Sequence, residues 1–265
     1  MTSLNYAVAD SATMLRRNLR HLQRYPTLTA SVLGTPAVFL LIFVYVFGGT
    51  LGAGLGHPTG GRAAYLGFVL PGILVLTIAA AAQATSVAVA MDMTTGIIAR
   101  FRTMSIARAS VLTGHVLGSM IQSMLGVGVI TGLAFLIGFR SAASPLSWLA
   151  AIGLLALAAL ALTWLTVALG LAAKSVETAS NTPMFLLLLP FLGSGFVPTS
   201  TLPTGLRWFA EYQPFTPVTT AVRRLLLGGA LGDNAVIAIA WSAGVAVGAY
   251  FWARHVYNTR PLPVR

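Results

Sequence analysis

Few side chains in this 265-residue sequence belong to the types that carry out covalent or metal chemistry, and they are scattered along it. There is no cysteine, which excludes disulfides, cysteine-bound zinc and iron–sulfur centres. The histidines do not show the short spacings of metal ligands. They are His21, His57, His115 and His255. The sequence therefore predicts no catalytic residue, no metal site and no cofactor bound by this chain.

One serine stands between two glycines in an apolar stretch, Gly193-Ser194-Gly195, as the nucleophile of an intramembrane protease does. Such a serine needs a base within hydrogen-bond reach. The only downstream histidine is His255, which lies beyond another apolar stretch. Protease chemistry is therefore disfavoured, and the chain is not predicted to be an enzyme.

The sequence also lacks the groups that would power transport by themselves. A phosphate-binding loop ends in Gly-Lys-Ser or Gly-Lys-Thr, and this ending is missing. No apolar stretch carries Asp, Glu, Lys or Arg near its middle, where a proton or ion relay would need one. The strongest polar side chains there are Gln83 and Gln122, with His115 near an end. Any transport must therefore draw its energy from a partner.

The composition predicts a membrane protein. Hydrophobic residues make up 57% of the chain and charged residues only 8%, against roughly 25% charged residues in soluble domains. The net charge of +11 comes from basic residues at the ends of apolar stretches, which is the pattern of topology signals. Nucleic-acid binding is therefore not expected. Lys174 is the only lysine, and with the Ala and Gly content this indicates a bacterial source.

Six apolar stretches predict an all-α, polytopic bundle in a single transmembrane domain, 1–265. The first stretch has the length of one bilayer core, about 30 Å, and is too long for the core of a cleaved signal peptide. The predicted spans cover residues 28–48, 66–90, 109–138, 148–173, 182–197 and 233–253.

Two further segments are predicted to lie at the membrane surfaces. Residues 4–24 have apolar side chains on one helical face and basic ones on the other, which indicates an interfacial helix; a flexible basic leader is the alternative. Residues 204–227 combine prolines with aromatic side chains, and Thr216-Pro217 resembles a helix start. We predict two short re-entrant helices in the outer leaflet, 204–212 and 217–227, with an ordinary loop as the alternative.

Basic residues set the predicted orientation. With the N-terminus in the cytoplasm, 11 basic residues fall on the cytoplasmic side and 5 outside, so both termini are expected in the cytoplasm. Arg223 and Arg224 depart from this pattern, because they fall in the outer segment.

The order of these segments and one motif resemble a known family. After the second span, Asp92, Gly96, Phe101, Arg102 and Met104 match the pattern Glu/Asp-x-x-x-Gly-x-x-x-x-(Phe/Leu)-Arg-x-Met. A second match is the segment 212–217, Tyr-Gln-Pro-Phe-Thr-Pro, followed by Arg223. Over nearly its whole length the chain resembles the type 2 ABC-exporter permeases, most closely the daunorubicin-resistance-like membrane subunits.

The resemblance implies a mechanism and partners. Two permeases, identical or homologous, pair in a bacterial cell membrane, and two ABC ATPase subunits, which bind ATP and magnesium, attach from the cytoplasm. Spans one, two and five line the route for an amphiphilic drug, antibiotic, lipid or glycolipid. A secondary transporter or channel is the alternative, and a membrane assembly factor is a third reading. Glycines spaced four apart, as in Gly128/Gly132 and Gly244/Gly248, indicate close helix packing inside one subunit or at a dimer seam.

The resemblance also assigns candidate residues, in three groups. The segment 92–104 is expected to be a coupling helix in which two arginines bind an acidic cleft of the ATPase and Phe101 and Met104 fill an apolar pocket; a plain interfacial loop is the alternative. The coupling residues are Asp92, Thr94, Gly96, Arg100, Phe101, Arg102 and Met104. The route residues are Phe39, Phe43, Thr77, Gln83, Phe185 and Phe191, and the outer gate is formed by Pro214, Phe215, Thr216 and Pro217.

Overall fold

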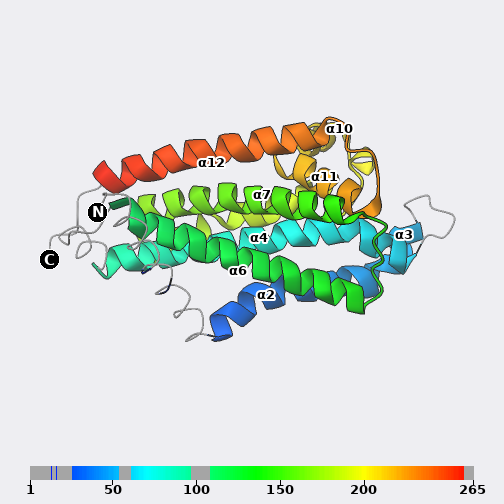
Figure 1. Cartoon of the computed structure of the whole chain (residues 1–265), viewed down its shortest axis with the longest axis horizontal. Coiled ribbons are helices and arrows are strands. Elements are labelled where there is room, and N and C mark those ends of the chain that lie inside the picture. The colour runs from blue at the N-terminus through cyan, green and yellow to red at the C-terminus, as the bar shows by residue number, and fades with distance from the viewer. Residues whose placement is uncertain (1–12, 14–15, 17–25, 54–60, 97–107, 260–265) are drawn as a thin grey trace.

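The computed structural model describes residues 13, 16, 26–53, 61–96 and 108–259, and these residues form helices and turns without a strand. The long helices lie roughly along one axis (Figure 1). The predicted all-α class is therefore confirmed. Most of the predicted interfacial helix, 4–24, and the part of the predicted coupling helix after Gly96 lie outside the described residues.

Five helical stretches of the described chain are long and apolar enough to cross a membrane. The first is a continuous run of α2 (Pro26–Leu41), a π-helical turn η1 (Ile42–Phe47) and α3 (Gly48–Ala53). The others are α4 (Arg62–Thr94), α6 (Arg108–Leu136), α7 (Pro145–Ala172) and α12 (Asn234–Thr259). Helices α4, α7 and α12 extend past the predicted span ends on at least one side.

Helix α4 is the central helix of the bundle. It contacts α2, α6, α7 and α11, and its Leu70, Ile73 and Ile78 side chains are buried in the main core. In Figure 1 it runs between α7 and α6. Its sequence has no polar face, and a helix that is apolar all round is stable only when other helices or lipid surround it.

Local sequence signals set the helix ends. Ser144 precedes α7 and its hydroxyl accepts a hydrogen bond from the Ser147 amide at 3.2 Å, with Pro145 at the first helical position. Gly228 follows α11 with a φ of +82°, a left-handed conformation that favours glycine, and the Gly229 amide donates to the Arg224 carbonyl at 2.8 Å. Ser144 and Gly228 thus mark helix boundaries that the sequence alone encodes.

The predicted fifth span, 182–197, is not one continuous helix. The region consists of α8 (Val176–Asn181), α9 (Met184–Leu188) and the 3₁₀ turn η2 (Leu189–Leu192), followed by turns around Gly193 and Gly195. Pro183 and Pro190 lack the amide hydrogen that a continuing helix requires. We call residues 176–197 the broken segment.

The segment after it folds into two helices, α10 (Thr204–Tyr212) and α11 (Phe215–Leu227). Both lie at the same end of the bundle as α3, opposite the end where α6 begins and α12 ends (Figure 1). Helix α11 begins at Phe215, one residue before the predicted N-cap Thr216, and the side chain of Thr216 donates to the Ala210 carbonyl instead of capping a helix. Thr216 therefore joins α11 to α10.

Two of the glycine pairs do not pack as expected inside one subunit. A methyl group added at Gly128, Gly132, Gly244 or Gly248 would meet no atom within 4 Å. The close helix contacts use other glycines: a side-chain carbon at Gly72 would lie 2.6 Å from the Gly195 carbonyl oxygen, and one at Gly170 would lie 2.5 Å from the Ser86 carbonyl oxygen.

Candidate transport route and outer gate

Three of the six predicted route residues meet in one aromatic cluster. The Phe191 ring centroid lies 5.4 Å from that of Phe39 and 6.2 Å from that of Phe43, so the broken segment packs on the first span here. Phe196 completes the group, stacked on Phe191 at 4.3 Å and 4.7 Å from Phe43. Phe196 was not predicted, although it stands five residues after Phe191 in the same apolar stretch. We call these four rings the phenylalanine cluster.

The other three route residues lie elsewhere. Thr77 is buried, and its hydroxyl donates to the Ile73 carbonyl of its own helix at 2.8 Å. Gln83 donates to the Ser180 carbonyl at 2.9 Å. Phe185 is half exposed and lines a separate cavity. The structure thus does not bring these three side chains to the phenylalanine cluster.

The broken segment is bound to α4 at both of its ends. Near the start of the segment, Ser86 donates to the Ala179 carbonyl at 3.0 Å, next to the Gln83 bond. At the other end, the Tyr65 hydroxyl donates to the Phe196 carbonyl at 3.0 Å. The segment therefore runs antiparallel to α4 while its own helical hydrogen bonding is interrupted.

One predicted gate residue, Thr216, binds the turn at the end of the broken segment, together with two residues that were not predicted, Gln213 and Thr220. Thr216 accepts a hydrogen bond from the Ser194 amide at 3.2 Å, and the Ser194 and Thr220 hydroxyls are 3.0 Å apart. Gln213 donates to the Leu189 carbonyl at 2.9 Å. A side chain at Gly193 would clash, because its first carbon would lie 2.1 Å from the Gln213 amide nitrogen. Thr216 and Gln213 thus join the start of α11 to this turn, with prolines 214 and 217 on either side of Thr216.

Arg223 joins α11 both to α4 and to the turn at Ser194. Its guanidinium donates to the Phe68 carbonyl of α4 at 3.0 Å and to the Ser194 carbonyl of the turn. It also lies 3.9 Å from the centroid of the Phe68 ring, a cation–π contact. We call Arg223, Ser194, Thr216 and Thr220 the outer latch. Arg224, by contrast, donates among the described residues to the nearby Leu231 carbonyl.

At the opposite end of the bundle, the described part of the coupling segment lies against α6. Asp92 and Thr94 belong to the last turn of α4, and Gly96 follows with a φ of +75°. The Asp92 carboxylate is buried, and its Oδ2 atom lies 3.1 Å from Nε2 of His115 in α6, which is a hydrogen-bond distance. Asp92 therefore joins the two helices that flank residues 97–107. Arg100, Phe101, Arg102 and Met104 lie outside the described residues.

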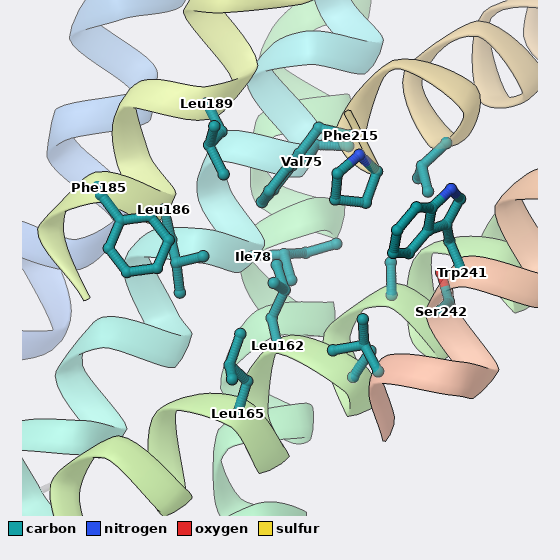
Figure 2. A pocket seen from close by; sticks show the side chains of 15 residues that line it. Val75, Ile78, Leu162, Leu165, Phe185, Leu186, Leu189, Phe215, Trp241 and Ser242 are labelled. Atoms are coloured by element: carbon teal, nitrogen blue, oxygen red, sulfur yellow. The ribbon is translucent and has the colours of Figure 1, made fainter. Parts of the chain in front are cut away.

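An apolar cavity of about 190 Å³ lies between α4, α7, α9, α11 and α12. Figure 2 shows Phe185 and Trp241 on opposite sides of it, with Ile78 and Leu162 between them. Pro214 and Phe215 of the predicted gate also line it. Within the described part of the chain, no three His, Asp or Glu side chains gather as metal ligands would.

These features define a class: a helical membrane subunit with apolar spaces between its helices and no catalytic constellation among the described residues. The family model of the ABC-2 type transporter matches residues 11–227, and the chain belongs to this family. The predicted resemblance is therefore confirmed. The protein is a permease subunit of an ABC transporter, and its family implies an ABC ATPase as partner.

Two relatives show how far the similarity extends. The chain is 28% identical to the daunorubicin resistance ABC transporter permease protein DrrB1 of Streptomyces coeruleorubidus, over 90% of this chain and 82% of the relative. It is 24% identical to the probable doxorubicin resistance ABC transporter permease protein DrrC of Mycobacterium tuberculosis (strain CDC 1551 / Oshkosh), over 89% of this chain and 84% of the relative.

Proposed function

We propose that this permease exports an amphiphilic, partly aromatic drug or lipid-like molecule across a bacterial cell membrane, past the phenylalanine cluster. Daunorubicin and doxorubicin stand in the names of the relatives. The observation that carries the proposal is the cluster itself, because three partly exposed phenylalanine rings of the first span and the broken segment, packed on the buried Phe196, form an apolar aromatic surface without a charge. Aromatic rings pack favourably on one another at such distances.

We propose six membrane crossings, with the broken segment as the fifth. Its contacts with α4 run from Ser86 to Tyr65, which are 21 residue steps apart. At about 1.5 Å per residue this is about 31 Å, close to the roughly 30 Å of a hydrocarbon core. An even number of crossings puts both termini on one side, and the excess of basic residues favours the cytoplasm.

We also propose that α10 and α11 are re-entrant in the outer leaflet. Phe215 lines the cavity together with Val75 and Ile78, near the middle of α4. The other end of α11 lies near the start of α4, where a side chain at Gly67 would touch Leu227. Helix α11 therefore covers the depth from the outer end of α4 to its middle, which supports a helix that enters the membrane and returns.

In the proposed mechanism, two ATPase subunits bind ATP and magnesium and grip residues 92–104 of two paired permeases. Closure of the ATPases moves the ends of α4 and α6, which Asp92 and His115 join. The broken segment follows α4 through the Gln83 and Ser86 bonds, and the turn at Ser194 then separates from α11. The outer latch is thus the contact that must open for cargo to leave.

Transport by the complete assembly tests this proposal. The permease would be co-expressed with its ATPase in inverted membrane vesicles, and ATP-dependent daunorubicin uptake measured. We expect Phe191→Ala to reduce uptake at least fivefold and to leave co-purification of the ATPase unchanged. Phe251→Ala, which alters an exposed ring on α12, serves as the matched control. Uptake without ATP or without the ATPase would favour a secondary transporter or channel and overturn the proposal.

A further inference from the structure

The broken segment separates two apolar spaces. Its Phe191 ring packs on the first span in the phenylalanine cluster. Its Phe185, Leu186 and Leu189 side chains instead line the cavity against α7 and α12. In Figure 2 these three residues lie on the cavity side of the segment. The cavity is therefore distinct from the space that the Proposed function assigns to cargo.

The cavity has a buried floor and an open mouth. Ile78 of α4 and Leu162 of α7 form part of the floor and are almost completely buried, at 0% and 8% exposed. Phe185 and Trp241 stand at opposite sides of the mouth and are 49% and 46% exposed. Helix α9 packs on α4 while α12 packs mainly on α7, so the mouth opens sideways between α9 and α12. In the arrangement of six crossings proposed above, both elements lie in the membrane and the mouth faces lipid.

The lining selects a hydrocarbon ligand. The Ser242 hydroxyl and the Trp241 indole are its only polar side-chain groups. A cargo with several polar groups would leave most of them without partners, at a large cost in free energy. An acyl chain has no such groups. An apolar cavity of about 150 Å³ binds benzene, so about 190 Å³ accepts a segment of roughly six to eight carbons.

We propose that this cavity binds the acyl chain of a membrane lipid, which enters from the bilayer between Phe185 and Trp241. The site has a structural consequence, because Phe215 and Val218 at the start of α11 form one of its walls. A bound chain fills the space beneath the helix that carries the outer latch. The lipid thereby supports α11 on the side opposite to its contact with Ser194.

Photo-crosslinking tests the site in the full chain. The protein would be placed in nanodiscs of phosphatidylglycerol that carries a diazirine in the distal half of its acyl chain, and labelled residues identified by mass spectrometry. We expect labels on floor residues such as Leu162, which bulk lipid does not reach. Ala161→Leu adds volume to the cavity wall and should reduce floor labelling at least fivefold. Ala156→Leu, on the same helix outside the lining, should not.

Labelling of the exposed Ile152 provides the internal reference, which neither substitution should change. If Ala161→Leu does not fold, Ser242→Leu fills the cavity from α12, with Ala243→Leu as its control. Absence of floor labels in the wild type, or floor labels that persist after filling, would overturn the proposal. Loss of floor labels on addition of daunorubicin would assign the cavity to cargo instead of lipid. These outcomes do not depend on ATP-driven uptake, which tests the Proposed function separately.

Discussion

Helix α4 and the broken segment lie side by side and cover the same depth, yet they are built differently. Helix α4 continues as one helix over 33 residues even though it contains Pro71, while the broken segment is interrupted at Pro183 and Pro190 and ends in a glycine turn. α4 is surrounded by other helices, whereas Met184, Phe185 and Leu188 of the segment are exposed. The comparison shows a continuous central helix beside a segment whose helical bonding is interrupted, and the proposed mechanism assigns the movement to the outer turn of that segment.

The largest expected effect comes from forcing these two elements apart. The side-chain carbon in Gly72→Ala would lie within 3 Å of three Gly195 backbone atoms, which cannot rotate away. We expect a loss of about 3 kcal/mol of stability, at the upper end of typical overpacking costs. Thermal unfolding in detergent measures it. Gly128→Ala is the control, because its new methyl group meets no atom; equal stability of the two variants would show that α4 and the turn do not touch.

Removing the outer latch comes next. Arg223→Ala removes the hydrogen bonds to the Phe68 and Ser194 carbonyls together with the cation–π contact, so we expect a loss of about 2 kcal/mol of stability. Arg223→Lys should recover little of it, because an ammonium group lacks the planar fork. Arg224→Ala should stay within about 0.5 kcal/mol. A cysteine at position 194, in this cysteine-free chain, should also react faster with external thiol reagents in Arg223→Ala; an unchanged rate would speak against a latch.

A smaller effect is expected at the other end of the broken segment. Gln83→Leu and Ser86→Ala each remove one hydrogen bond to α8, and the typical net contribution of such a bond is about 1 kcal/mol. We expect about this loss in thermal unfolding for each variant, together with weaker coupling of ATP hydrolysis to uptake. Thr85→Ala, which removes a hydroxyl that donates to the Ala81 carbonyl of its own helix at 3.1 Å, is the control. If the control loses as much coupling between ATP hydrolysis and uptake as Gln83→Leu and Ser86→Ala do, the Gln83 and Ser86 bonds do not transmit motion.

Apolar length and local signals made most of the fold predictable. The stretches that became α4, α6, α7 and α12 are apolar over a full bilayer thickness, and no tertiary information was needed to find them. Residues 182–197 were predicted as one span because they are apolar throughout, and the interruption of the helix at Pro183 and Pro190 was not considered. The two prolines can be read from the sequence. The hydrogen bonds that hold the interrupted segment in place come from α4, however, and the sequence does not show them.

The candidate site was less predictable, because it depends on residues far apart in the chain. Arg223 departs from the pattern that basic residues lie mainly on the cytoplasmic side. Its role in joining α11 to α4 follows from a contact with Phe68, 155 positions away in the sequence. Phe39, Phe43 and Phe191 lie together because they belong to elements that the resemblance implicated and that pack on one another, while their role in transport stays a prediction. Thr77, Gln83 and Phe185 were assigned by the same reasoning but face other directions, since helix membership does not fix which way a side chain points.

The central claim, that the outer latch must open during export, has a direct test. Ser194→Cys and Thr220→Cys replace two hydroxyls that lie 3.0 Å apart, so a disulfide between them would lock the turn onto α11. In vesicles that contain the ATPase, we predict that the oxidised double variant binds the ATPase but loses ATP-dependent daunorubicin uptake, and that a reductant restores it. The single variants should remain active. Full uptake by the completely cross-linked protein would contradict the account.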